Sequence, residues 1–70
     1  MRKEFEVHML NDYGKHSAAG IADNFDYLLD FLEPLMYDSR CAAIVRAKLE
    51  EACFFAKKAM ASNKENQVEV

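Results

Sequence analysis

The chain has 70 residues, a net charge of −3 at pH 7 and 51% hydrophobic residues, with only two cysteines. A chain this short forms one small domain with a modest core, so disulfides, a metal or oligomerisation are expected to support it. The negative charge argues against broad binding to long nucleic acids, but it leaves room for a local cationic pocket for a small anion. No signal peptide and no membrane span are expected, because no apolar run is long enough.

Residues 1–16 are expected to form an arm and a turn. Phe5, Val7 and Met9 alternate with polar residues, which indicates a short strand or an extended arm. Residues 11–16 are turn-like. Ser17 is the expected N-cap of the first helix, although Asn11 and Asp12 offer an earlier start.

The first helix is predicted at residues 17–36. Pro34 should kink or end it, because proline removes an N–H and disfavours a helical residue before it. Four acidic residues share the face opposite the apolar seam, where solvent is expected: Asp23, Asp26, Asp30 and Glu33. The apolar seam itself follows spacings of three and four and is widened by two further residues: Ile21, Phe25, Leu28, Leu32 and Leu35, with Leu29 and Met36.

The second helix is predicted at residues 38–62, with Asp38 or Ser39 as its N-cap and a polar, frayed tail at 63–70. Ile44 and Phe55 point away from its main apolar face, and so do Ala43 and Phe54 on another side. A helix that is apolar on several sides must be buried on several sides. The main face is Ala42, Val45, Leu49, Ala52, Ala56 and Ala59, flanked by Cys53 and Met60. The prediction is therefore an all-α antiparallel helical hairpin with a short N-terminal arm, assembled into a homo-oligomer.

The titratable residues give little sign of catalysis or of a metal. Cys41 and Cys53 lie roughly three turns, or about 18 Å, apart on one helix, which is too far for a disulfide, so they are interpreted as buried thiols. His8 and His16 lack a metal-binding spacing. Since no phosphate loop, carboxylate pair or nucleophile arrangement occurs either, no metal, no cofactor and no enzymatic activity are expected.

Four residues are candidates for ligand binding: Tyr13, Lys15, Arg40 and Arg46. Arg40 follows a predicted helix N-terminus, where free N–H groups and a guanidinium would suit an anion. The alternative for Arg40 is an ion pair with Asp38 or with an acid of another protomer. The alternative for Arg46 is an exposed i,i+4 pair with Glu50. Tyr13 and Lys15 could stack on and contact a nucleotide, or could be ordinary loop surface.

Part of the second helix resembles a known family. The matching residues are Asp-Ser-Arg at 38–40, Ala-Ile at 43–44, Arg-Ala-Lys-Leu-Glu-Glu-Ala at 46–52 and Lys-Ala-Met-Ala at 58–61. This segment, about a third of the chain, is similar to the second helix of the small phage anti-CBASS proteins. These proteins are cyclic-oligonucleotide sponges related to the Thoeris anti-defence proteins.

The resemblance implies a phage protein of the host cytoplasm that sequesters cyclic di- or trinucleotide messengers, without cleaving them, and so blocks CBASS immunity. It implies a homo-oligomer, typically a hexamer, with pockets between protomers. Arg40 and Arg46 match basic positions of the family helix, and Tyr13 corresponds to a tyrosine before helix one. Ala47 replaces a frequent threonine and Leu28 replaces an expected lysine, so one of the usual pockets should be altered or absent. The rival interpretation is a small oligomeric protein–protein interaction module or inhibitor.

Overall fold

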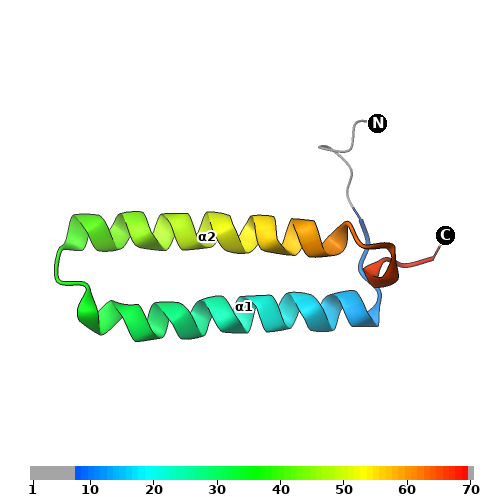
Figure 1. The fold of residues 1–70 in the computed structure, drawn as a ribbon, viewed down its shortest axis with the longest axis horizontal. Coiled ribbons are helices and arrows are strands. Elements are labelled where there is room, and N and C mark those ends of the chain that lie inside the picture. The colour runs from blue at the N-terminus through cyan, green and yellow to red at the C-terminus, as the bar shows by residue number, and fades with distance from the viewer. Residues whose placement is uncertain (1–7, 70) are drawn as a thin grey trace.

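The computed structural model describes residues 8–69 and consists of two antiparallel helices (Figure 1). Helix α1 spans Asp12–Leu32 and is followed by a 3₁₀ turn, η2, at Glu33–Leu35; helix α2 spans Ser39–Ala61 and is followed by a second 3₁₀ turn, η3, at Lys64–Asn66. The predicted all-α hairpin is confirmed. The strand or arm predicted for the first residues falls mostly on 1–7, which lie outside the described residues.

Helix α1 begins earlier than predicted. Asn11, not Ser17, is its N-cap, and the Asn11 side chain accepts the backbone N–H of Gly14. Asparagine is among the best N-cap residues, because its side-chain oxygen satisfies an N–H that the first turn leaves free. The residues expected to form a turn are therefore the first turn of α1. At the far end α1 stops at Leu32, four residues before the predicted bound at 36, and the end expected near Pro34 is found, since Pro34 lies in η2.

Helix α2 lies within one residue of its predicted bounds at both ends. Asp38 is the N-cap and accepts the N–H of Cys41 at 2.9 Å. At the other end the hydroxyl of Ser62 donates to the carbonyl oxygen of Ala59. Both ends of the helix thus have local hydrogen-bond partners of their own.

The two helices pack along a stripe that is rotated from the predicted one. Leu28 and Leu35, placed in the seam of the first helix, are 41% and 60% exposed, and Ala52 and Ala59 of the second helix are exposed as well. The residues predicted to widen or flank the two seams are covered instead. Of the residues in the two predicted seams and their flanks, those that are buried or half-buried are Ile21, Phe25, Leu29, Leu32 and Met36 from the first helix to the connection, with Ala42, Val45, Leu49, Cys53, Ala56 and Met60 of α2.

The hairpin is a single layer of helices. Its principal extents are 49 × 25 × 11 Å, and Ala42 is the only buried apolar residue in the part of the chain that is described. Stable domains normally bury their apolar faces between two packed layers. The large side chains left exposed within residues 8–69 are Met9, Tyr13, Tyr27, Leu28, Phe31, Leu35, Tyr37, Ile44, Phe54, Phe55 and Val68.

The open end of the hairpin is closed by the chain after α2. The tail predicted at 63–70 was expected to fray, but η3 lies against the start of α1 (Figure 1). Leu10 and Gln67 form an antiparallel bridge, and the N–H of Val68 donates to the carbonyl oxygen of Met9 at 2.9 Å. The polar side chains of this segment take part as well, since Asn66 and Gln67 donate to the carbonyl oxygens of Met60 and Ala61. Backbone bonds and side-chain to backbone bonds together hold the segment in place.

Two glycines of α1 provide a matched test of this closure. A Cβ on Gly14 would come within 2.3 Å of the carbonyl oxygen of Asn66, whereas a Cβ on Gly20 would meet nothing within 4 Å. Gly14→Ala should therefore destabilise the protein by about 1–3 kcal/mol, because the backbone of η3 must move. Gly20→Ala should stabilise it by about 0.5–1 kcal/mol through helix propensity. Thermal unfolding should show a lower melting temperature for Gly14→Ala and a higher one for Gly20→Ala. A higher melting temperature for Gly14→Ala would show that the C-terminal residues do not pack against Gly14.

Candidate functional site

The four candidate residues lie at different places on the hairpin. Tyr13 and Lys15 are exposed in the first turn of α1, at the open end, whereas Arg40 is exposed in the first turn of α2, beside the connection between the helices. Arg46 follows almost two turns further along α2. Since α1 is 21 residues long, Tyr13 and Arg40 are separated by about 30 Å along the hairpin. One copy of the chain therefore does not bring the candidates together.

Tyr13 lines a pocket of about 430 Å³ at the open end. Its other lining residues are His16 and Ser17 of α1, with Glu65 and Asn66 of η3. Tyr13 is 78% exposed, so its ring is available for stacking against a planar ligand. Lys15 is not a lining residue. Sequence reasoning missed Glu65 and Asn66, because it treated their segment as a frayed tail.

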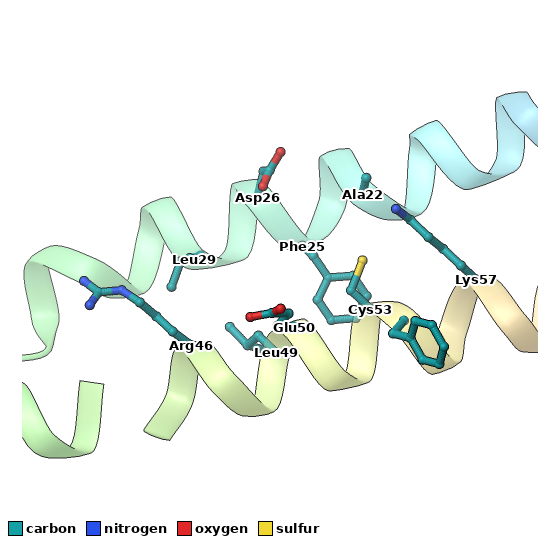
Figure 2. Close-up of a pocket in the computed structure, with 10 residues that line it drawn as sticks. Ala22, Phe25, Asp26, Leu29, Arg46, Leu49, Glu50, Cys53 and Lys57 are labelled. Carbon is teal, nitrogen blue, oxygen red and sulfur yellow. The ribbon is translucent and has the colours of Figure 1, made fainter. Parts of the chain in front are cut away.

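A longer groove of about 550 Å³ runs between the two helices. Its floor is apolar and its edge carries two acids and two bases, as Figure 2 shows for the labelled side chains. Arg46 extends at one end and Lys57 at the other, with Glu50 between them on the same helix. The lining residues are Ala22, Phe25, Asp26, Leu29, Arg46, Leu49, Glu50, Cys53, Phe54 and Lys57.

Arg46 forms an ion pair, but not the one predicted. Its Nε lies 3.4 Å from Oε1 of Glu33, across the connection between the helices, rather than pairing with Glu50 on its own helix. The two side chains are 52% and 45% exposed, so the pair contributes little stability. Arg46 thus sits at the rim of the groove with a weak partner that an anionic ligand could replace.

Arg40 has no hydrogen-bond or ion-pair partner for its side chain within residues 8–69. The pair with Asp38 that the sequence allowed is not formed, because the Asp38 carboxylate is used as the N-cap of α2. The hydrogen bond from the backbone N–H of Cys41 holds the pKa of Asp38 below its usual value, and the backbone N–H of Arg40 acts in the same direction. The guanidinium of Arg40 therefore projects into solvent at a helix N-terminus.

Most of the other titratable groups are exposed. Cys41 is exposed and Cys53 is half-buried, so the prediction of two buried thiols is wrong, most clearly for Cys41. Asp23, Asp26, Asp30 and Glu33 are exposed, as predicted. Across residues 8–69 no cluster of three or more histidine, cysteine or acidic residues is placed to hold a metal. Over the same residues, no helix has the length and apolar character that a membrane crossing needs.

The site thus consists of an aromatic pocket at one end, a lone arginine at the other, and an apolar groove with a charged rim between them. A scan against protein-family models, a search of curated proteins and a search of solved structures each return no match for this chain.

Proposed function

We propose that this protein binds and sequesters cyclic di- or trinucleotide messengers and thereby blocks CBASS-type signalling in the host cell of a phage. The observation that carries the proposal is the pocket beside Tyr13, where an exposed aromatic ring stands next to polar side chains. Proteins recognise unpaired bases by stacking them on aromatic rings and hydrogen bonding to their edges. The resemblance of residues 38–61 to the anti-CBASS sponges supplies the ligand class.

The working unit in this proposal is a homo-oligomer, and the exposed apolar residues support it. Phe54 lines the groove, whereas Phe55 lies about 100° further around α2. On α1, two exposed apolar residues, Leu28 and Phe31, lie roughly 140–200° around the helix from Asp26, which lines the groove. Leu35, in η2, is exposed as well. The side of the hairpin away from the groove, called the back face below, thus carries Leu28, Phe31, Leu35, Ile44 and Phe55.

A second copy of the chain is the partner that fits these surfaces. The rim of the groove carries Asp26 and Glu50 as well as Arg46 and Lys57, so its net charge is zero and an antiparallel copy can pair acid with base. The back face carries exposed apolar residues, with the cation Lys48 between Ile44 and Phe55 along α2. Exposed apolar patches of this kind on a small protein mark sites of association.

Assembly also offers a way to complete the ligand site. Tyr13 and Arg40 lie at opposite ends of one hairpin, so a partner running antiparallel would place its own Arg40 near the Tyr13 pocket. A base could then stack at Tyr13 while the guanidinium of the partner holds a phosphate. This arrangement agrees with the pockets between protomers that the family resemblance implies.

A thermal-shift screen against cyclic oligonucleotides tests the proposal. The panel contains cyclic di-adenylate, cyclic di-guanylate, cyclic GMP–AMP and cyclic tri-adenylate. A true ligand should raise the melting temperature, because ligand at a hundred times Kd adds about 2.7 kcal/mol of stability. Linear dinucleotides of the same composition are the matched controls. No shift with any member of the panel would favour the rival, an interaction module that binds a protein through its apolar faces.

The bound messenger should be recovered intact. Cleaving a phosphodiester needs an activated nucleophile and stabilisation of the developing charge, often by metal ions. The arginines proposed to hold phosphate stay charged and are poor proton-transfer groups. After hours of incubation with magnesium or manganese and heat denaturation, chromatography of the supernatant should return the cyclic form. Linear product that accumulates in proportion to protein would contradict sequestration.

A further inference from the structure

Asn11 uses its whole side chain to join the two ends of the described chain. A side-chain amide has one acceptor oxygen and two N–H donors. The Oδ1 atom accepts the N–H of Gly14 at 2.9 Å, and this bond caps α1. The Nδ2 atom donates to the carbonyl oxygens of Glu65 at 2.8 Å and Gln67 at 3.1 Å. One residue therefore caps the helix and holds residues 64–68, called the C-terminal segment below.

Backbone contacts on both sides of Asn11 align the C-terminal segment. The N–H of Asn11 donates to the carbonyl oxygen of Asn66 at 3.0 Å, and the N–H of Val68 donates to that of Met9. Gly14 allows the approach, since any Cβ there would collide with the Asn66 carbonyl. The segment is thus fixed by hydrogen bonds that converge on the residue before α1.

The C-terminal segment is also half of the Tyr13 pocket. Glu65 and Asn66 form one wall, and Tyr13, His16 and Ser17 form the other. The carbonyl oxygens of those two wall residues accept from the side chain and from the backbone N–H of Asn11, respectively. Without the segment, Tyr13 would be an isolated ring on an exposed helix.

The lining of the pocket suits a base rather than a phosphate. Neither Lys nor Arg is among its lining residues, whereas the acidic residue Glu65 is, together with Tyr13. A carboxylate repels phosphate but accepts hydrogen bonds from the amino and imino groups of a base. The phosphates of a cyclic nucleotide bound here must then be held from outside this pocket.

We infer that Asn11 is the positioning residue of a base-binding pocket, whose second wall is the C-terminal segment that Asn11 holds. The inference rests on the proposed function and deepens it, because it assigns the base to the open end and names the residue that builds the pocket. Asn11 itself need not touch the ligand.

The decisive variant is Asn11→Asp. Aspartate keeps an acceptor for the N-cap bond and is as good a cap as asparagine, but it has no donor for the carbonyl oxygens of Glu65 and Gln67. The Kd for the tightest binder among the four cyclic oligonucleotides named above should rise roughly tenfold or more, as expected for a lost hydrogen bond that leaves acceptors unpaired. Asn11→Ser keeps the N-cap without adding charge, and it should raise the Kd by a similar factor.

The matched control is Asn24→Asp. Asn24 is an exposed residue of the same helix, and its Nδ2 donates only to the carbonyl oxygen of Gly20. The substitution adds the same charge without touching the C-terminal segment, so the Kd should change little. If Asn11→Asp and Asn24→Asp raise the Kd equally, the effect comes from the added charge alone, and the inference is overturned.

A double-mutant cycle separates positioning from general destabilisation. If Asn11 acts through the pocket, Asn11→Asp should cost much less affinity when Tyr13→Ala is already present, because the two changes remove the same site. Additive effects would contradict the assignment. Light scattering should return the wild-type mass for every variant.

Hydrogen exchange tests the clamp even without a ligand. In Asn11→Asp and Asn11→Ser the amide of Val68 should exchange faster, whereas that of Ala42, which donates to the Asp38 carbonyl oxygen at the other end, should not change. An unchanged Val68 amide would overturn the inference whether or not nucleotides bind. If the wild-type protein binds no cyclic nucleotide but the Val68 amide exchanges faster in the two variants, the proposed function is refuted and the role of Asn11 in holding the C-terminal segment is established.

Discussion

Phe54→Asp and Phe55→Asp should each break the assembly. Phe54 and Phe55 are 62% and 55% exposed on the hairpin, and their rings touch edge to face, with centroids 5.3 Å apart and planes at 84°. Phe54 borders the groove and Phe55 belongs to the back face, so a second copy on either side covers one of them. An unpaired carboxylate buried in such a contact costs several kcal/mol. Light scattering at micromolar concentration should find the wild-type protein as an oligomer and both variants at a much lower mass.

Phe54→Leu and Phe55→Leu are the matched controls, because leucine keeps the site apolar and removes only the ring contact. Both should remain oligomeric, with a modest loss of stability. The aspartate variants should also lose cooperative thermal unfolding, since the single-layer hairpin has almost no core of its own. A monomeric wild-type protein, or aspartate variants of unchanged mass, would refute the assembly.

The sequence predicts the two helices well and the stripe between them poorly. Spacings of three and four along α1 fit a seam through Leu28 and Leu35 as well as one through Leu29 and Met36. A helix that packs against only one other helix has a narrow covered stripe. Because α1 has more apolar residues than this stripe needs, the sequence does not show which of the two seams faces α2. Leu28 and Leu35 are exposed on the back face, as expected if a further apolar partner covers that face.

The open end was predictable in part. Asn11 was recognised as an alternative start, and its strength as an N-cap explains the five extra residues of α1. The docking of residues 64–68 was not predictable, because polar side chains hold the segment through backbone carbonyls 54 or more positions away in the sequence. Such pairings have no hydrophobic period to reveal them.

The candidate site shows the same division between local and distant signals. Capping chemistry placed Arg40 correctly in the first turn of a helix, because an N-cap is a local feature. The predicted partner of Arg46 was wrong. Its actual partner, Glu33, lies 13 positions away across the connection, whereas helix spacing considers only neighbours on the same helix, such as Glu50. The Tyr13 pocket needed residues from both ends of the chain, so local patterns could identify the ring but not its surroundings.

Arg40→Ala should weaken messenger binding strongly while leaving the oligomer intact. The guanidinium is exposed and has no side-chain partner in the part of the chain that is described, so its removal costs the folded protein no internal contact. A charge-assisted hydrogen bond to phosphate contributes about 1.5–3 kcal/mol, which corresponds to a rise in Kd of roughly 10- to 150-fold. Calorimetric titration with the tightest binder from the thermal-shift panel measures the change. Lys48→Ala, which removes an exposed cation from the same helix, is the control and should leave Kd nearly unchanged. An Arg40→Ala protein with wild-type affinity would place the phosphate elsewhere, with Arg46 at the rim of the groove as the next arginine to test.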